Sequence, residues 1–394
     1  MMNRQRAYLD YNATAPLLPA AREAMVAALD MPGNPSSVHA EGRAAREAYS
    51  RAREAVARLC GAEAAHVTFT SGATEAASHV LTPDFRMGRA PVRLDTLFIG
   101  AAEHPCVIAG GRFDPETVKT LPVDRDGLID INAVRDAIQA YGAGNNGDGQ
   151  FMLALQLANN ETGVVQPIRK IADFVHAAGG VMVVDAVQAA GRLPIDIEAL
   201  GADFLFVSAH KIGGPKGAGA LVSRGETFMP SPLIRGGGQE KGHRAGTENL
   251  AAIVGFGAAA EVAVEALANV GDLAARRDAM EARMREAAPD VIIHGAGAPR
   301  LANTSYVSLP GLKAETAQIA FDMEGIAVSS GSACSSGKVG PSHVLKAMDA
   351  DADLGAIRVS LGLATSDNDI DAFIEAFAKI NARRLARLAG QNAA

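Results

Sequence analysis

The feature of this sequence that most restricts its fold is a regular alternation, between residues 16 and 255, of short apolar runs with segments of helical periodicity. The apolar runs are VTFTSG, DTLFIG, FMLALQL, VMVVDA, FLFVSA and GALVS. Strands that alternate with helices in this way form a mostly parallel sheet flanked by helices. We therefore predict that residues 16–255 form a large α/β domain.

The sequence beyond residue 255 predicts a second, smaller domain. An Ala-rich segment of helical pattern over residues 253–270 is the candidate connector. After it, DVIIHG, NTSYVSLP, IAVSSG and AIRVSLG predict strands separated by helices, and a final helix is expected over residues 367–388. We predict a small α+β domain built from residues 1–15 and 256–394. Residues 141–150, which are rich in Gly and Asn, predict a surface loop.

The composition argues against several classes of protein. The chain of 394 residues is 48% hydrophobic and can bury large cores, and its net charge of -7 comes without a long basic block, which argues against a nucleic-acid partner. The three cysteines form no CxxC pair and have no zinc-ligand spacing, so we expect neither disulfides nor a metal site. Because the sequence shows no apolar signal segment and no run of about 18 apolar residues, we expect a cytoplasmic protein without a membrane span.

Small or polar residues follow most of the apolar runs of the large domain. These clusters are TSGATE, AAEHP, ANNETG, DAVQ and SAHK. In open α/β sheets the ligand binds beyond the carboxyl ends of the strands. We therefore expect the five clusters to meet at one crevice, which makes their side chains candidates for a binding or catalytic site.

Two of these clusters together suggest a pyridoxal-phosphate site. Lys211 directly follows an apolar run and precedes Gly-Gly-Pro, and Asp185 ends the run VMVVD. Pyridoxal phosphate needs a lysine for its aldehyde and an acid that keeps its pyridine nitrogen protonated, and Gln188 is then placed to bond the ring hydroxyl. The alternatives are an ordinary turn lysine and an aspartate that caps a helix.

The other clusters offer further contacts for such a cofactor. The segment TSGATE follows a strand and opens an Ala-rich helix, so its backbone N–H groups suit a phosphate, although the same residues also serve as a simple cap. His104 and Asn160 follow two more strands, and each alone fits a structural loop residue. In company with the lysine and the acid, they fit a histidine over the pyridine ring and an amide near its hydroxyl.

In order and spacing, the motifs of this chain resemble the cysteine desulfurases of the NifS/IscS type, which are class V aminotransferase-like, fold type I pyridoxal-phosphate enzymes. The motifs are YLDYNATAP, GNPSSVHAEGRAAR, TFTSGATE, EHPCV, NNETGVVQPI, VDAVQAAGRLPIDI, SAHKIGGPKGAGAL, GGGQEKGHRAGTEN and SSGSACSSGK. The resemblance implies a fold type I enzyme that converts L-cysteine to L-alanine and passes the sulfur, as a persulfide, to an acceptor or iron–sulfur scaffold protein.

Two kinds of alternative stay open beside this resemblance. The same scaffold also fits a selenocysteine lyase or another class V lyase or aminotransferase. A non-catalytic docking protein for sulfur carriers is the alternative from a different class. Iron–sulfur cluster assembly and related sulfur pathways are the processes that the resemblance implies.

The resemblance also implies roles for individual residues. Lys211 is the expected Schiff-base lysine, Cys334 the thiol that accepts sulfur, and His104 the residue that stacks on the ring and carries protons. The remaining cofactor contacts are expected from Asp185 at the pyridine nitrogen, Gln188 and Asn160 at the ring hydroxyl, and Ala73, Thr74, Ser208 and His210 at the phosphate.

Three more residues complete the expected site. The resemblance implies a homodimer in which Thr247 reaches the phosphate of the neighbouring subunit. Arg358 is expected to bind the substrate carboxylate through its planar fork, with help from Asn34. The Gly- and Ser-rich setting of Cys334 fits a thiol that must carry sulfur away from a buried cofactor. The other two cysteines, Cys60 and Cys106, are expected to be packing residues.

Overall fold

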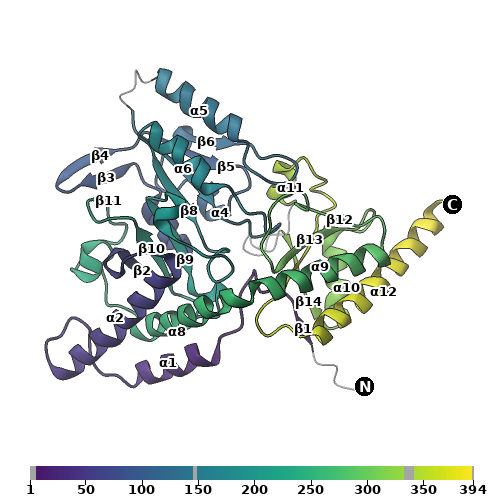
Figure 1. Ribbon diagram of the computed structural model, residues 1–394, viewed down its shortest axis with the longest axis horizontal. Helices are drawn as coiled ribbons and strands as arrows, with labels where there is room; N and C mark the ends of the chain where they lie inside the picture. Colours follow the sequence, from purple (N-terminus) through teal and green to yellow (C-terminus); the bar gives the residue numbers. More distant parts are fainter. Residues whose placement is uncertain (1–5, 145–148, 332–340, 393–394) are drawn as a thin grey trace.

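A seven-stranded sheet forms the centre of the large domain (Figure 1). The computed structural model describes residues 6–144, 149–331 and 341–392. In spatial order the strands are β2 (Val67–Thr70), β10 (Gly219–Ser223), β9 (Phe204–Ser208), β8 (Val181–Asp185), β7 (Phe151–Gln156), β5 (Thr96–Gly100) and β6 (Val118–Leu121). The pairs from β9 to β6 are parallel, and β10 is antiparallel to both of its neighbours. The prediction of a mostly parallel sheet is therefore confirmed.

Both faces of this sheet are buried, which explains why its strands read as continuous apolar runs. Successive side chains of a strand point to opposite faces. In β8, Met182 and Val184 belong to one core cluster, and Val181 and Val183 belong to another. The first cluster is covered by α1 (Pro19–Leu29), α2 (Ala40–Cys60), α5 (Ile131–Gly144), α6 (Ile168–Ala177), α7 (Ile197–Leu200) and α8 (Leu250–Ala266), and the second by α3 (Ala73–Val80) and α4 (Pro105–Ile108).

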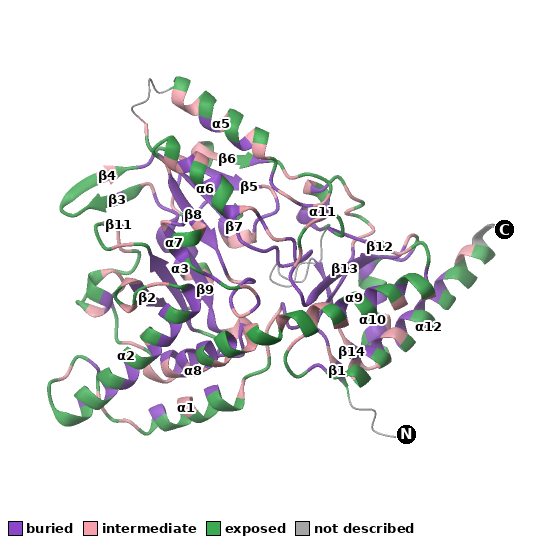
Figure 2. Ribbon diagram, in the orientation of Figure 1, coloured by how far each residue is buried: buried purple, intermediate pink, exposed green. Residues whose placement is uncertain are grey.

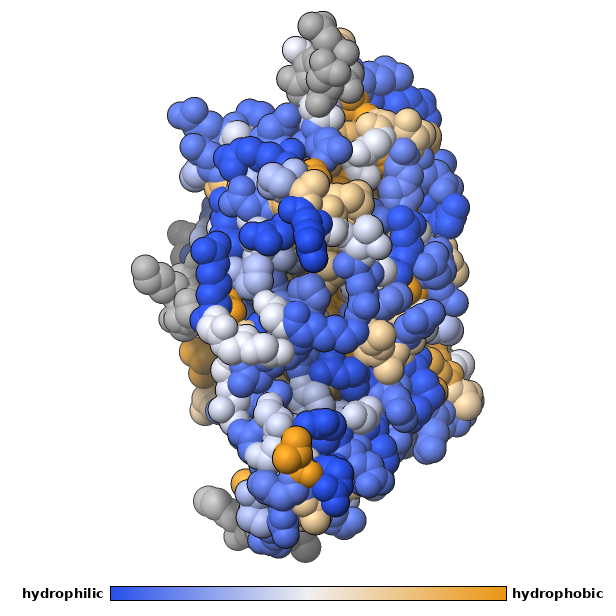
Figure 3. All heavy atoms as spheres, turned by 90° about the vertical axis from the view of Figure 1, so that its left-hand side faces the viewer, coloured by the Kyte–Doolittle hydropathy of each residue, from blue (hydrophilic) through white to orange (hydrophobic). Residues whose placement is uncertain are grey.

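A small antiparallel sheet at one side of the large domain was not predicted from the sequence. It consists of β11 (Phe228–Pro230), β3 (Asp84–Met87) and β4 (Ala90–Arg93). These strands are short and partly exposed, and Phe85 stacks on Phe228 with ring centroids 4.6 Å apart. The side of the protein that carries them is mostly hydrophilic, and its apolar residues lie in small separate patches (Figure 3).

A second core lies toward the C-terminus. Its antiparallel sheet has the order β12 (Ile292–Ile293), β13 (Thr304–Ser308), β16 (Ile357–Ser360) and β15 (Ser329–Ser330), and β1 (Ala7–Tyr8) pairs in parallel with β14 (Ile326–Ala327). The helices are α9 (Val270–Ala287), α10 (Ala314–Met323), α11 (His343–Ala347) and α12 (Asp367–Asn392). Leu9, Phe321 and Phe373 belong to its buried apolar cluster. Figure 2 shows the buried strands and inner helix faces of both cores.

The helix that joins the two parts belongs to the core of the large sheet. Ile253, Phe256 and Ala263 of α8 pack into the cluster on that sheet, and the last two lie beyond the predicted boundary at residue 255. We therefore propose that the boundary between the two domains lies where α8 ends. The helical stretch Leu250–Ala287 is the one span in the described residues that is long and apolar enough to cross a membrane, and 44% of its most apolar window is buried inside the protein.

Two local expectations differ from the structure. The run at residues 326–331 is divided between two sheets, because β14 pairs with β1 while β15 pairs with β16. The first four residues of the expected loop at 141–150 continue α5, which ends at Gly144. The apolar run at 326–331 was recognised in the sequence, but its two partner strands lie elsewhere in the chain. The Gly- and Asn-rich composition of residues 141–150 did not show where α5 ends.

Candidate functional site

A cavity of about 640 Å³ lies at the carboxyl ends of the central strands. Residues from all five polar clusters line it. Nine of the residues expected at the cofactor lie there, namely Ala73, Thr74, His104, Asn160, Asp185, Gln188, Ser208, His210 and Lys211. The position follows from topology, because neighbouring parallel strands end at the same edge of the sheet.

The side chain of Lys211 enters this cavity from a short turn. The 3₁₀ turn Ala209–Lys211 directly follows β9, so the lysine leaves the sheet at its carboxyl edge. Its Nζ donates hydrogen bonds to the backbone carbonyl oxygens of Asn12 at 2.6 Å and Ala13 at 2.9 Å. The amine is thus held by the N-terminal segment, which sequence reasoning did not single out as part of the site.

Asp185 ends the neighbouring strand β8 and is buried. Its Oδ1 accepts a hydrogen bond from the backbone N–H of Val187 at 2.9 Å. Burial raises the pKa of this carboxyl to about 6, and the Val187 hydrogen bond and the positive charge of Lys211 act in the opposite direction. A cation bound beside Asp185 would stabilise the charged form further. This is the electrostatic setting that a protonated pyridine nitrogen requires.

The amide of Gln188 is held in one orientation. Its Oε1 accepts from Nη1 of Arg192 at 2.6 Å, and its Nε2 donates to the carbonyl oxygen of Asn12 at 3.1 Å. Arg192 is buried, and burial lowers its pKa to about 10. Sequence reasoning missed Arg192, although its position four residues after Gln188 in VQAAGR was a usable signal.

His104 caps the N-terminus of α4 with its ring. Nδ1 accepts a hydrogen bond from the backbone N–H of Cys106 at 3.2 Å, and the Cys106 thiol lies 3.0 Å from the same nitrogen. A ring nitrogen that accepts in this way carries no proton, so the neutral ring has its proton on Nε2. Burial, with the positive charge of Lys211 as the next cause, lowers the pKa of His104 to about 4. The imidazole is therefore neutral near pH 7.

Two further groups beside His104 were not predicted as parts of the site. Cys106 lines the cavity, and burial raises the pKa of its thiol, so the sulfur stays protonated. The side chain of Glu103 is fully buried, and its Oε1 accepts from the backbone N–H of Gln156 at 3.1 Å. Burial and the negative charge of Asp185 raise the pKa of Glu103 well above its usual value. Burial thus favours the uncharged form of both Glu103 and Cys106, the groups on either side of His104 in the sequence.

The opposite side of the cavity is the N-terminus of α3. Backbone N–H groups at a helix start favour anions. Glu75 in this first turn accepts from the Ser71 N–H at 2.8 Å and pairs with Nε of Arg244 at 2.9 Å. Burial would raise the pKa of Glu75, but the hydrogen bonds from Arg244 and Ser71 hold it below its usual value. The first turn of α3, which is the candidate phosphate cradle, is therefore linked through the Glu75–Arg244 ion pair to the segment that leads to Thr247.

His210 lies on the same side, where Nδ1 contacts Oγ1 of Thr14 at 3.2 Å. Burial lowers the pKa of His210 to about 4, with the positive charge of Lys211 as the next cause. A phosphate dianion in the cavity would act against this shift, because an opposite charge nearby favours the charged form.

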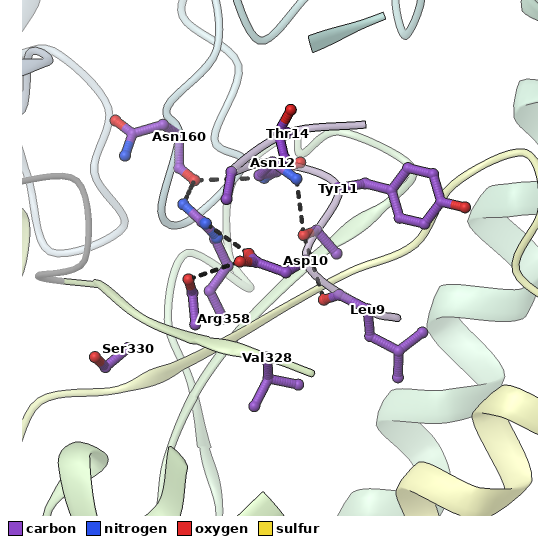
Figure 4. Close-up of polar contacts among 12 residues, drawn as sticks. Leu9, Asp10, Tyr11, Asn12, Thr14, Asn160, Val328, Ser330 and Arg358 are labelled. Carbon is purple, nitrogen blue, oxygen red and sulfur yellow. Dashed lines mark hydrogen bonds and ion pairs between the residues drawn. The ribbon is translucent and has the colours of Figure 1, made fainter. Parts of the chain in front are cut away.

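Arg358 is not among the residues that line the cavity, because it lies behind Asn160 (Figure 4). Its side chain is 1% exposed, and its Nη1 donates to the backbone carbonyl oxygen of Asn160 at 2.9 Å. Nη2 forms an ion pair with Asp10 at 2.8 Å, and Asp10 also accepts from the hydroxyl of Ser329 at 3.0 Å. To bind a substrate carboxylate, Arg358 has to exchange one of these contacts.

Besides Arg358, two expected residues in the described part of the chain, Asn34 and Thr247, do not line the cavity. Asn34 lies in the exposed loop between α1 and α2, where its Oδ1 accepts from the Ser36 N–H at 2.8 Å. Thr247 is exposed in the segment before α8. Cys334 lies outside the described residues. The exposed position of Thr247 agrees with its expected role at a neighbouring subunit, and the roles of Thr247 and Asn34 stay predictions.

Comparisons with known proteins agree with this arrangement of sheet and site. The family model described as Aminotransferase class-V matches residues 7–373. A cysteine desulfurase from Cereibacter sphaeroides is 42% identical over 380 residues, which are 94% of each chain. Cysteine desulfurase NifS from Azotobacter vinelandii is 36% identical over 93% of this chain and 90% of its own length. A solved NifS-like protein from Rickettsia africae superposes with a TM-score of 0.82 at 32% identity, covering 96% of this chain and 99% of its own.

Together, the sheet, the strand-end lysine and the strand-end acid define a class V aminotransferase, a family whose members use pyridoxal phosphate. Within this class, the relatives that match more than nine tenths of the chain at 36–42% identity are cysteine desulfurases. The chain belongs to the class V aminotransferase family and, within it, to the cysteine desulfurases of the NifS/IscS type.

Proposed function

We propose that this protein takes the sulfur atom from L-cysteine, releases L-alanine, and uses pyridoxal phosphate to do so. The observation that carries the proposal is the pairing of Lys211 and Asp185 at the ends of two adjacent parallel strands, facing one cavity. A lysine and a buried acid that face one cavity are the donor set that this cofactor needs. Membership of the cysteine desulfurase family supplies the choice of substrate.

The residues present fit the cofactor by the chemistry of their donors. Lys211 would hold its aldehyde carbon, Asp185 its ring nitrogen, and the first turn of α3 its phosphate. Gln188 and Asn160 would contact the ring hydroxyl. When bound, the group supplies an aldehyde that condenses with amines and a ring that takes up an electron pair.

The substrate would be oriented and deprotonated by three side chains. Arg358 would bind the carboxylate of L-cysteine, assisted by Asn34 of a neighbouring subunit. The Nζ of Lys211 is the group that takes the α-proton. The neutral imidazole of His104 carries its proton on Nε2 and would give it to the leaving carbon, and its Nδ1 would take the substrate thiol proton only after exchanging the hydrogen bond from the Cys106 N–H.

Sulfur transfer would take place at Cys334. Its thiolate attacks the sulfur of the substrate, so a sulfur–sulfur bond forms and the carbon–sulfur bond breaks. The electron pair of the broken bond returns to the carbon, which takes up a proton and becomes the methyl group of L-alanine. The products are L-alanine and one persulfide on the protein, and their atoms equal those of L-cysteine and one thiol.

The partners in this proposal are a second copy of the chain and a sulfur acceptor. Thr247 is exposed next to the cradle of its own subunit, in a segment that Arg244 ties to Glu75, and would reach the phosphate of the neighbouring site. An acceptor or iron–sulfur scaffold protein in the cytoplasm would take the persulfide sulfur.

The proposal is tested by supplying L-cysteine to purified, cofactor-loaded protein and measuring L-alanine over time. The expected result is alanine formation by the natural chain and its loss in Cys334→Ser. Full alanine formation in Cys334→Ser would show that sulfur leaves by another route, as in an aminotransferase or another lyase. No alanine from loaded natural protein would refute the proposal as a whole.

A further inference from the structure

A buried carboxylate next to the site takes no part in the steps above. Glu161 follows Asn160 in the loop after β7, and it is 2% exposed. Its Oε2 accepts two short hydrogen bonds, one from the hydroxyl of Ser342 at 2.6 Å and one from that of Tyr306 at 2.7 Å. Tyr306 lies on β13, and Ser342 is the N-cap residue of α11. One oxygen of the large domain thus binds two elements of the C-terminal core.

The backbone at Gly331 packs against the same carboxylate. A Cβ atom at Gly331 would lie 1.9 Å from the hydroxyl oxygen of Tyr306 and 2.5 Å from Oε2 of Glu161, so only glycine fits there. Gly331 and Ser342 stand on the two sides of residues 332–340 in the sequence, the segment that contains Cys334. Both described ends of that segment therefore meet at Glu161.

The loop that carries Glu161 is itself fixed to the large sheet. The side-chain oxygen of Asn159 accepts from the backbone N–H groups of Glu161 at 2.9 Å and Thr162 at 2.8 Å. The side-chain amide of Asn159 donates to the carbonyl oxygen of Ala102 at 2.9 Å. Asn160, between them, lines the cavity. Any group held by Glu161 is therefore held at a fixed place relative to the cavity.

Charge makes these contacts stronger than hydrogen bonds between neutral groups. Hydrogen bonds to a carboxylate are shorter than those between neutral groups, and leaving such a buried group without its donors is costly. Burial raises the pKa of Glu161, and the hydrogen bonds from Ser342 and Tyr306 and the positive charge of Arg358 act in the opposite direction. The separations of 2.6 and 2.7 Å fit such charge-assisted bonds.

We propose that Glu161 is a positioning residue that holds both ends of the Cys334 segment against the large domain and so sets how well the Cys334 thiol reaches the substrate sulfur. The inference rests on the proposed function, because it takes Cys334 as the sulfur acceptor. The proposed role of Glu161 concerns only one step of the reaction. Glu161 would affect sulfur transfer to Cys334 and would not affect substrate binding in the cavity.

The test compares Glu161→Gln with the natural protein in single-turnover experiments on the cofactor-loaded enzyme. Two quantities are followed, namely the cofactor absorbance change as L-cysteine binds and the formation of L-alanine with protein-bound sulfur. Glutamine keeps the volume but loses the charge, so we expect the affinity seen in the absorbance change to stay within about twofold and sulfur transfer to slow by about tenfold or more.

Matched variants separate positioning from general destabilisation. Glu281 is also buried, and it accepts hydrogen bonds from the Ser305 hydroxyl at 2.6 Å and from the Arg300 guanidinium at 2.7 and 3.0 Å, so Glu281→Gln controls for the loss of a buried carboxylate that binds other partners. Ser342→Ala is expected to slow sulfur transfer, and Ser342→Thr, which keeps the hydroxyl, to restore it. The serine pair also provides the test if Glu161→Gln fails to fold.

The outcomes distinguish this inference from the proposed function. If natural protein forms no alanine, the proposed function fails. If it does form alanine, the inference is overturned by normal sulfur transfer in Glu161→Gln or Ser342→Ala. The inference is also overturned if Glu161→Gln loses substrate binding and sulfur transfer to the same extent. It is overturned as well if Glu281→Gln slows sulfur transfer as much as Glu161→Gln does. A purely structural role predicts both of these results.

Discussion

The amine of Lys211 lies 2.6 Å from the backbone carbonyl oxygen of Asn12. Asn12 is fully buried, and its side chain donates to the hydroxyl of Thr304 at 2.9 Å and accepts from the amide of Asn303 at 3.0 Å. The residue that holds the lysine is therefore bound to the C-terminal core. Because of this link, the position of the lysine in the large domain depends on the packing of both parts of the chain.

The lysine assignment is tested by comparison with a second lysine of the same cavity. Lys216 also lines the cavity, but it is exposed and lies beyond the strand-end turn. We expect Lys211→Ala to lower the rate of alanine formation by at least about 10²-fold, as for the loss of a proton-transferring group. Borohydride reduction of the loaded protein followed by peptide mapping should place the cofactor on Lys211. Cofactor attached to Lys216 in the natural protein would contradict the assignment.

The role of Arg358 predicts a dependence on the substrate carboxylate. Arg358→Leu removes the planar fork, so we expect KM for L-cysteine to rise by about tenfold or more. Cysteamine, which lacks the carboxylate, should bind natural protein and variant about equally. The cofactor absorbance change on titration with each amine measures both affinities. An equal loss for the two compounds would show that Arg358 acts through packing and not through the carboxylate.

The protonation state of His104 gives a prediction in pH. Its pKa in the folded chain is about 4, below the ordinary value of 6.5, because the ring is buried. The unfolded chain binds more protons between these two values, so His104 contributes stability near pH 7 that is lost as the pH falls from about 6.5 toward 4. In cofactor-free protein, the NMR signals of the labelled His104 ring should not titrate between about pH 5.5 and 8. A midpoint near 6.5 would contradict this account.

The segment before Thr247 is held by a buried ion pair. Arg53 binds both carboxylate oxygens of Glu240 at 2.9 and 3.0 Å, and Glu240 and Lys241 both have positive φ angles, of 48° and 55°. Strained backbone of this kind persists only where its surroundings hold it. Arg53→Met removes the cationic partner of this carboxyl, whose pKa burial raises to about 8, and leaves, among the described residues, only the hydrogen bond from the Phe69 N–H at 2.9 Å, so we expect it to lower the free energy of unfolding by about 3 kcal/mol.

A control for the Arg53 prediction lies on the same helix. Arg51 pairs with Glu47 one turn away, and both side chains are largely exposed. Exposed pairs of this kind contribute about 0.2–1 kcal/mol, so Arg51→Met should change the free energy of unfolding by no more than that. Urea unfolding followed by circular dichroism measures both variants. Similar values for the two would contradict a special role for the buried pair.

Most of the central sheet and much of the cavity could be predicted, for a physical reason. Parallel strands buried on both faces produce apolar runs, and topology sends their carboxyl ends to one edge. The clusters around Lys211, Asp185 and His104 were therefore visible in the sequence. The antiparallel direction of β10 and the exposed strands of the small sheet had no such signature.

Other parts of the site depend on contacts between distant segments. Glu103 and Glu161 are polar residues whose burial is decided by packing across the whole chain, so local patterns could not assign their roles, whereas Arg192 was missed despite its place four residues after Gln188. The expected carboxylate ligand Arg358 lies behind Asn160 and is already paired with Asp10. Asn34 and Thr247 stay away from the cavity of a single chain, which the resemblance anticipated only for Thr247.

The central claim is that sulfur leaves L-cysteine and is bound by Cys334. The most direct measurement is one turnover of cofactor-loaded protein with L-cysteine, in which released L-alanine is quantified and the protein is alkylated, digested and mapped by mass spectrometry. The account predicts equal amounts of L-alanine and of one extra sulfur atom on the Cys334 peptide, with none on Cys60 or Cys106. Failure to form alanine, or alanine formed with the extra sulfur on another cysteine, would contradict it.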